Sequence, residues 1–164
     1  LNVYVTPVTK TEFILGKQVP YLVLGFLNYI CLLFMAVYLF DVPLTGSFWT
    51  LTWAMLFYLI VATGVGLVIS SITKSQTAAI FLSMILTMIP TTQFSGLTNP
   101  VSALEGGARL IGEISPATYM FMISRGVFNK ALGFEELHSY IQPLQIAAVV
   151  VVVAAILLMN KQER

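Results

Sequence analysis

Three charged side chains recur every fourth residue in the stretch QFSGLTNPVSALEGGARLIGEISPATY, Gln93 to Tyr119. Glu105, Arg109 and Glu113 would share one face of a helix, where neighbouring opposite charges contribute about 0.2–0.5 kcal/mol per pair. Such a row is typical of a solvated helix face. It can also form a polar gate above a transport path. The sequence leaves both interpretations open.

Groups that could carry out catalysis or bind a metal do not occur together. The single histidine, His138, lies in the acidic stretch FEELHSY, and one histidine without nearby cysteines does not match zinc-site spacing. Ser95 lies in FSG, but no apolar stretch contains a histidine that could activate a serine. The only cysteine, Cys31, lies in an apolar run and fits a small core residue. We therefore predict a protein that is not an enzyme and that binds no metal or cofactor.

The composition indicates which solvent surrounds the elements that hold these residues. Of the 164 residues, 58% are hydrophobic and 9% are charged, and the mean hydropathy is +0.90. Soluble domains carry about 25% charged residues. The net charge of +1 provides no basic field that would favour nucleic acid. A lipid bilayer is therefore the expected environment.

Four apolar stretches approach or exceed the roughly 20 residues that a helix needs to cross a bilayer. They cover residues 19–40, 48–72, 77–97 and 140–159. The fold class that they predict is an all-α, polytopic membrane protein with a single membrane domain over residues 1–164. No Asp, Glu, Lys, Arg or His lies in these stretches, which argues against a proton-driven or sodium-driven carrier.

Prolines and turn residues predict where the helices begin, bend and end. Residues 41–47 predict a short turn, so that the first two spans form a hairpin. We expect Pro143 near the start of the last helix, where proline is tolerated. Pro20 and Pro90 lie inside helical patterns and predict kinks, because proline removes one backbone hydrogen bond.

Lysine and arginine predict the sidedness, because short cytoplasmic segments carry an excess of both. One side would hold residues 1–18, an interfacial segment, and both termini, with Lys10, Lys17, Lys74, Lys161 and Arg164. We predict this side to be cytoplasmic. The other side would hold residues 98–139, with Arg109, Arg125 and Lys130.

The external segment 98–139 is too polar to span and too apolar for a solvated loop. Irregular backbone at membrane depth persists only where protein buries it. We therefore predict a re-entrant helical pair, broken at Ser115–Pro116. It would act as a plug with Leu110, Ile111 and Ile114 packed against the bundle.

A row of small residues lies on the second span. Ala62, Gly66 and Ser70 recur every four residues, and small side chains let helices approach closely in lipid. We interpret this row as a helix contact, either within the chain or across a dimer. Incidental small residues in an apolar helix remain an equal alternative.

Three motifs in order resemble the permease subunits of type-2 ABC exporters. YVTPVTKTEFILGKQVPY (4–21) resembles the family's passage from the coupling helix into its third membrane helix. FSGLTNPVSAL (94–104) is similar to the start of its external re-entrant segment, although LEGGA replaces the usual proline that follows. SPATYMFMISRGVF (115–128) is similar to the stretch before its sixth helix. The chain would then be the C-terminal part of a six-helix permease.

The resemblance implies roles for individual residues. The segment coupled to the ATPase would contain Tyr4, Thr6, Pro7, Glu12 and Lys17. The external re-entrant segment or gate would contain Ser95, Gly96, Pro100, Glu105, Arg109, Glu113, Pro116 and Arg125.

The resemblance also implies partners and a location. A separate ABC subunit would bind ATP and Mg²⁺, and a second permease copy would form a homodimer or heterodimer with this chain. Both would act at the bacterial inner membrane. The alternative function is a passive channel or a structural membrane scaffold, which would need no ATPase.

Overall fold

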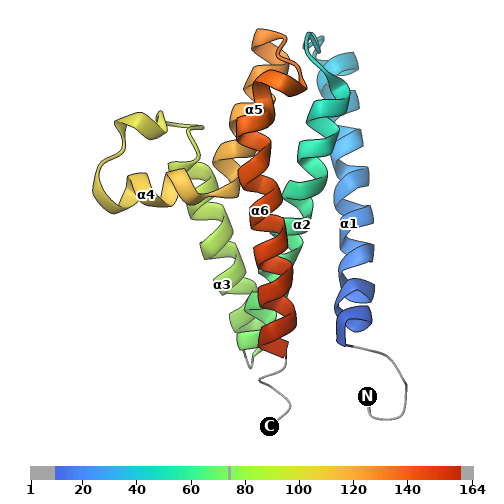
Figure 1. Cartoon of the computed structure of the whole chain (residues 1–164), viewed down its shortest axis with the longest axis vertical. Helices are drawn as coiled ribbons and strands as arrows, with labels where there is room; N and C mark the ends of the chain where they lie inside the picture. Colours follow the sequence, from blue (N-terminus) through green and yellow to red (C-terminus); the bar gives the residue numbers. More distant parts are fainter. Residues whose placement is uncertain (1–9, 74, 160–164) are drawn as a thin grey trace.

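The computed structural model describes residues 10–73 and 75–159, and this part of the chain is helical without strands (Figure 1). The all-α prediction is confirmed. The long helices are α1 (Lys10–Phe34), α2 (Phe48–Ile72), α3 (Gln76–Ile89) and α6 (Phe134–Met159). The shorter elements are the π-helical turns η2 (Met35–Leu39) and η3 (Pro90–Phe94), the 3₁₀ turn η4 (Val101–Ala103), and the helices α4 (Gly106–Ile114) and α5 (Pro116–Lys130).

Four helical segments of the described chain are long and apolar enough to cross a membrane, as predicted. They are Thr11–Leu39, Phe48–Ile72, Gln76–Phe94 and Phe134–Leu158. The first and the last begin earlier than the apolar stretches that predicted them. Residues 10–18, which we expected in an interfacial segment before the first span, are therefore part of α1 itself.

The prolines explain part of this difference. α1 continues through Pro20 without ending, and Pro143 lies well inside α6 instead of near its start. α6 begins at Phe134 because Glu136 caps it, its Oε2 accepting a hydrogen bond from the Gly133 N–H at 2.7 Å. At Pro90 the α-helix does give way to a π-helical turn. There the Thr92 hydroxyl donates to the Met88 carbonyl at 2.8 Å.

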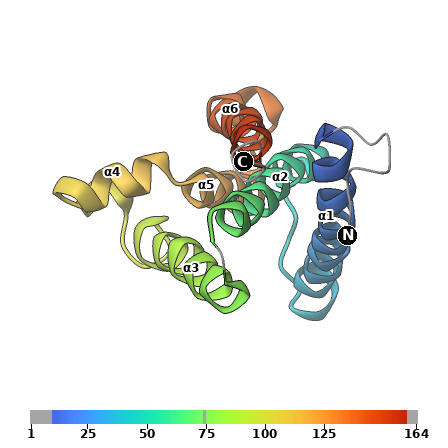
Figure 2. The same ribbon diagram turned by 90° about the horizontal axis from the view of Figure 1, so that it is seen from below.

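α2 is the central helix, with α1, α5 and α6 packed around it (Figure 2). The main core lies between them and contains Tyr29, Leu51, Ala54, Ile123, Val127, Leu137, Ile141 and Leu144. Glycines allow two of the closest approaches. A Cβ at Gly25 would lie 2.7 Å from Leu59, and one at Gly64 would lie 2.6 Å from Val151. Cys31, which we expected in a core, is exposed.

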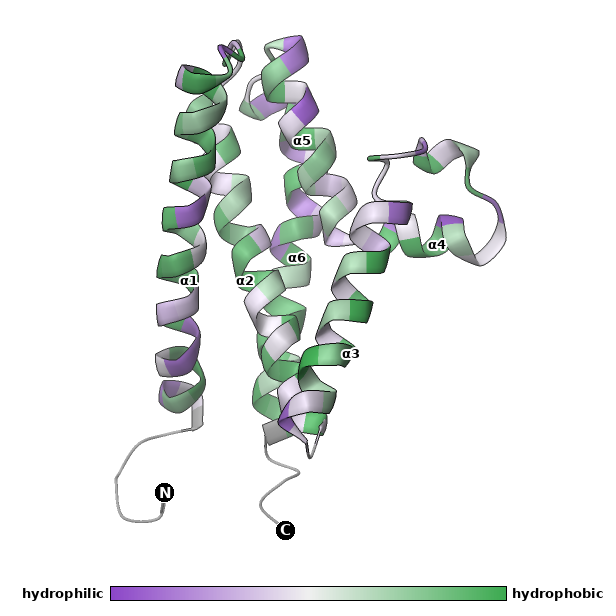
Figure 3. Ribbon diagram, turned by 180° about the vertical axis from the view of Figure 1, so that it is seen from behind, coloured by the Kyte–Doolittle hydropathy of each residue, from purple (hydrophilic) through white to green (hydrophobic). Residues whose placement is uncertain are grey.

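α3 stands apart from this core. None of its residues is buried, and its large apolar side chains, such as Phe81 and Ile80 at 61% each, are exposed. Figure 3 shows hydrophobic residues along its length. Within the described chain α3 contacts mainly α2 and its own continuation, η3. Its surface is therefore free to meet lipid or another chain.

The beginning of α1 and the end of α6 lie at the same end of the bundle as the junction between α2 and α3 (Figure 1). The turn between α1 and α2 and the turn between α5 and α6 lie at the opposite end. Gln76 is the first residue of α3 and His138 lies near the start of α6, so that these two exposed residues are at opposite ends of the spans.

The arrangement leads to a labelling prediction. With Cys31 replaced by serine, a cysteine at Gln76 should react with an impermeant maleimide only after the cytoplasmic face is opened. A cysteine at His138 should react from outside, because positive residues flank the predicted cytoplasmic ends. Intact and permeabilised cells provide the comparison. Labelling of both positions from one side would contradict the four-span arrangement.

Candidate functional site

The predicted re-entrant segment forms two helices that meet at a corner. α4 extends sideways from the bundle and α5 runs along it (Figures 1 and 2). Ser115 joins them, and Pro116 occupies the start of α5, where a missing N–H costs nothing. The predicted break at Ser115–Pro116 is therefore present.

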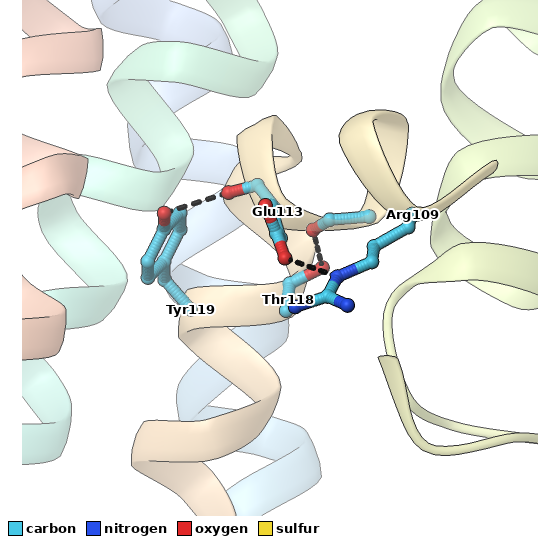
Figure 4. Close-up of polar contacts among 5 residues, drawn as sticks. Arg109, Glu113, Thr118 and Tyr119 are labelled. Carbon is cyan, nitrogen blue, oxygen red and sulfur yellow. Dashed lines mark hydrogen bonds and ion pairs between the residues drawn. The ribbon is translucent and has the colours of Figure 1, made fainter. Parts of the chain in front are cut away.

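Two hydrogen bonds fix this corner (Figure 4). The buried Thr118 hydroxyl donates to the Gly112 carbonyl at 2.6 Å, and the Tyr119 hydroxyl donates to the Glu113 carbonyl at 2.6 Å. Both acceptors are among the last carbonyls of α4, which have no partner inside their own helix. Side chains of α5 thus hold the end of α4 in place.

The charged residues of α4 form an exposed pair. Arg109 Nε lies 2.7 Å from Glu113 Oε1, with side chains 57% and 49% exposed, respectively. Such pairs contribute about 0–1 kcal/mol. Glu105 is the residue before α4, and its side chain makes no capping hydrogen bond. This geometry fits a solvated helix face, and the gate stays a prediction.

The apolar side chains of α4 are not packed against the bundle. Leu110, Ile111 and Ile114 are exposed, so that the predicted contact is wrong for the described chain. The helix instead approaches η3 through its one buried residue, Gly112, whose Cβ would lie 2.6 Å from the Phe94 carbonyl oxygen. The small size of this glycine, and not an apolar stripe, sets the contact.

The loop before α4 contains three further predicted residues. Ser95 is buried, and its hydroxyl donates to the Thr91 carbonyl. Gly96 has φ +89°, a left-handed conformation that glycine adopts without strain. Pro100 directly precedes η4. Arg125, on α5, is exposed, and its Cζ lies 5.6 Å from the centroid of the Phe121 ring. It is therefore not part of the Arg109–Glu113 pair on α4.

Two members of the small-residue row of α2, Gly66 and Ser70, line an open groove. A Cβ at Gly66 would meet no other atom within 4 Å, and Ala62 and Ser70 are exposed. The close contacts within the chain use Gly64 instead. A hollow of about 420 Å³ here is lined by Lys17, Gln18, Tyr21, Thr63, Gly66, Leu67 and Ser70. A second, of about 640 Å³, continues from it to α3.

Two polar residues of α1 were not predicted. Gln18 is buried, and its Nε2 donates to the Ile60 carbonyl at 3.2 Å and to the Thr63 hydroxyl at 3.0 Å. Asn28 lines a cavity of about 410 Å³ between α1, α2 and α5. A polar amide in an apolar membrane-spanning stretch costs free energy unless it has a structural or functional role. An amide at such a position was therefore the sequence signal that could have pointed to both residues.

The predicted coupling residues are only partly visible. Tyr4, Thr6 and Pro7 lie outside the described residues. Glu12 and Lys17 lie exposed in the first turns of α1, and Lys17 Nζ is 4.5 Å from the Phe13 ring centroid. They lie toward the same end of the bundle as the end of α6 (Figure 1).

Comparisons with known proteins now agree with these features. The family model described as "ABC-2 family transporter protein" matches residues 2–158. The "Probable multidrug ABC transporter permease YbhS" of Escherichia coli K12 is 29% identical over 123 residues, which are 75% of this chain and 33% of that protein. The related YbhR of the same strain is 25% identical over 140 residues, 85% of this chain and 38% of that protein. No solved structure matches.

The matches thus span little more than a third of the length of these curated relatives. The family model, in contrast, covers nearly the whole chain together with its four candidate membrane helices. The chain is an integral membrane protein that belongs to the ABC-2 transporter family.

Proposed function

We propose that the chain forms part of the translocation path of an ATP-driven exporter in the bacterial inner membrane, with both termini cytoplasmic. The observation that carries the proposal is the groove along α2, open between α1 and α3 and lined by Gly66 and Ser70. The two related permeases are named for multidrug transport, and their family implies an ATP-binding partner subunit. That subunit would bind ATP and Mg²⁺, and this chain would not act as an enzyme.

A groove open on one side forms a closed path only when another surface covers it. α3 has no buried residue, and small side chains line the groove beside it. Both features suit contact with a second permease copy, which would be identical to this chain or related to it. Small residues allow such helices to approach closely in lipid. The exposed apolar surface elsewhere would face lipid.

Coupling to the ATPase would act through α1. Closure of the ATP-binding subunits would push the cytoplasmic segment of residues 1–18, and α1 begins within it. The Gln18 amide links α1 to α2 through Ile60 and Thr63, so that both helices would move together. Their movement would open the groove outward, as alternating access requires.

A bulky residue in the groove tests this proposal. Gly66→Trp should lower ATP-dependent export by the full-length permease and its ATPase at least tenfold, which corresponds to about 1.4 kcal/mol of barrier. The matched control is Gly107→Trp, because Gly107 also meets no atom within 4 Å but lies outside both the groove and the coupling segment. Transport is measured in vesicles with and without ATP. Flux that needs no ATP would contradict the exporter and favour a passive channel.

A further inference from the structure

We propose that the cavity between α1, α2 and α5 is a binding site for an uncharged amphiphilic molecule, held by hydrogen bonds to Asn28 and Ser124. This site lies within a single chain. The inference rests on the proposed function, which it deepens by naming a cargo class and a place where cargo is held. Its first test needs no ATP, so that it can fail independently of export.

The cavity has the size and lining of a small-molecule site. Its volume of about 410 Å³ falls within the roughly 300–1,000 Å³ typical of such sites. Its walls are mostly apolar and include Leu32, Met55, Met120, Phe121 and Phe128. Methionine side chains adapt to irregular shapes, and aromatic rings provide a large contact area.

Asn28 provides a polar group that is exposed on the open side of the bundle and has no protein partner. In the part of the chain that the structure describes, neither its amide nor the Ser124 hydroxyl makes a hydrogen bond to protein. Two other polar side chains of α1 do have partners, since Gln18 bonds to Thr63 at 3.0 Å and the Tyr29 hydroxyl lies 3.1 Å from that of Thr52. An unsatisfied amide is costly at membrane depth. A ligand that bonds to Asn28 would remove this cost.

The charges around the cavity define the ligand class. Its lining contains no Asp, Glu, Lys, Arg or His. An ion entering it would lose its hydration without gaining a counter-charge, which is strongly unfavourable. Ser95, which also lines the cavity, already donates its hydroxyl hydrogen to Thr91. The Tyr58 and Thr91 hydroxyls, which also line it, interact with each other, so that Asn28 and Ser124 are the groups left to orient a neutral ligand.

The backbone beside the cavity is irregular on two walls. Each π-helical turn of the described chain contributes one lining residue, Ala36 from η2 and Thr91 from η3. Such turns are rare and occur frequently at functional sites. Their coincidence at one cavity is independent of the Asn28 argument and points to the same place.

Photoaffinity labelling of the purified full-length permease in nanodiscs, without ATP, tests the site. The probe is a monoacylglycerol with a diazirine in its acyl chain, and the charged counterpart is lysophosphatidic acid with the same chain. We expect the neutral probe to label peptides that contain Met55 or Met120 at lower concentration than the charged one. Equal labelling by both probes, or labelling elsewhere only, would overturn the proposal.

Substitutions separate a binding role from a structural one. Asn28→Leu should raise the half-saturating probe concentration about fivefold to tenfold, the effect of one lost hydrogen bond. The melting temperature of Asn28→Leu should not fall, because the substitution replaces an unpaired amide by an apolar side chain. Ser124→Ala should act in the same direction. The matched controls are Asn129→Leu and Ser139→Ala, whose side chains do not line the cavity. Unchanged labelling of Asn28→Leu would overturn the proposal.

Competition distinguishes two sources of such a molecule. Benzanilide, a neutral aromatic amide, would displace the probe if the cavity takes compact cargo. Retention of the probe would assign the cavity to a membrane lipid, and either result supports an uncharged ligand. Wild-type labelling together with absent ATP-dependent export would reject the proposed function and leave the site standing.

Discussion

Replacement of Gly46 by alanine is expected to lower the free energy of unfolding by about 1–3 kcal/mol, the usual cost of overpacking a full site. A Cβ at Gly46 would lie 2.8 Å from the Val127 carbonyl oxygen and 2.9 Å from that of Leu132. Both obstacles are backbone atoms, which cannot move aside as a flexible side chain can. The turn between α1 and α2 would have to separate from the end of α5.

That separation would also break polar contacts. The Gly46 N–H donates to the Val127 carbonyl at 2.9 Å, and the Thr45 hydroxyl lies within 3.1 Å of the same oxygen and 2.9 Å of the Phe128 oxygen. The melting temperature of the purified protein in detergent measures the effect. Gly16→Ala is the control, because its Cβ meets nothing within 4 Å and alanine favours helix. Equal melting of the two variants would show that the turn does not dock as described.

The second large effect is expected at Gly112. A Cβ there would lie 2.6 Å from the Phe94 carbonyl oxygen and 3.2 Å from Val101. Gly112→Ala should therefore lift α4 away from η3. Amide hydrogen exchange in the peptide that contains α4 should become at least tenfold faster, which corresponds to about 1.4 kcal/mol of lost protection.

The same helix offers its own controls. Gly107→Ala lies on α4 with nothing within 4 Å of the new Cβ, and alanine favours helix, so that exchange should not become faster than in the wild type. Arg109→Ala removes only an exposed ion pair, worth about 0–1 kcal/mol, and should act less than Gly112→Ala. Slower exchange in both glycine variants would mean that helix propensity alone, and not the contact with η3, protects α4. Protection unchanged in Gly112→Ala would contradict the contact with η3.

The four spans could be predicted because the length of an apolar stretch is enough to identify a membrane-spanning helix. Their boundaries could not be read in the same way. α6 extends past its apolar run to Phe134 because one carboxylate, that of Glu136, caps a polar first turn. α1 continues through Pro20, since a proline inside a helix need not end it.

Faces were harder to predict than lengths. α2 is apolar on all sides, so that periodicity does not distinguish a packed face from an open one. By sequence alone, Gly66 and Gly64 were equally good candidates for a close contact between helices. In the structure only Gly64 of the two lies against a neighbouring helix. On α4 the pattern correctly separates charged from apolar residues, but it does not say what covers the apolar side. Tertiary packing decided both cases.

The docking of the α1–α2 turn onto α5 bears on the order in which the protein is built. α5 has 15 residues, about 22 Å of helix, fewer than the roughly 20 residues that insert as a span. It therefore depends on hydrogen-bond donors that are already in place, and Thr45 and Gly46, which donate to its last carbonyls, leave the ribosome before it does. The first hairpin can serve as a template on which a later, short helix settles. A defect in the turn between α1 and α2 would then affect a late step of folding. All four spans would be inserted, but α5 would not be docked in its native position.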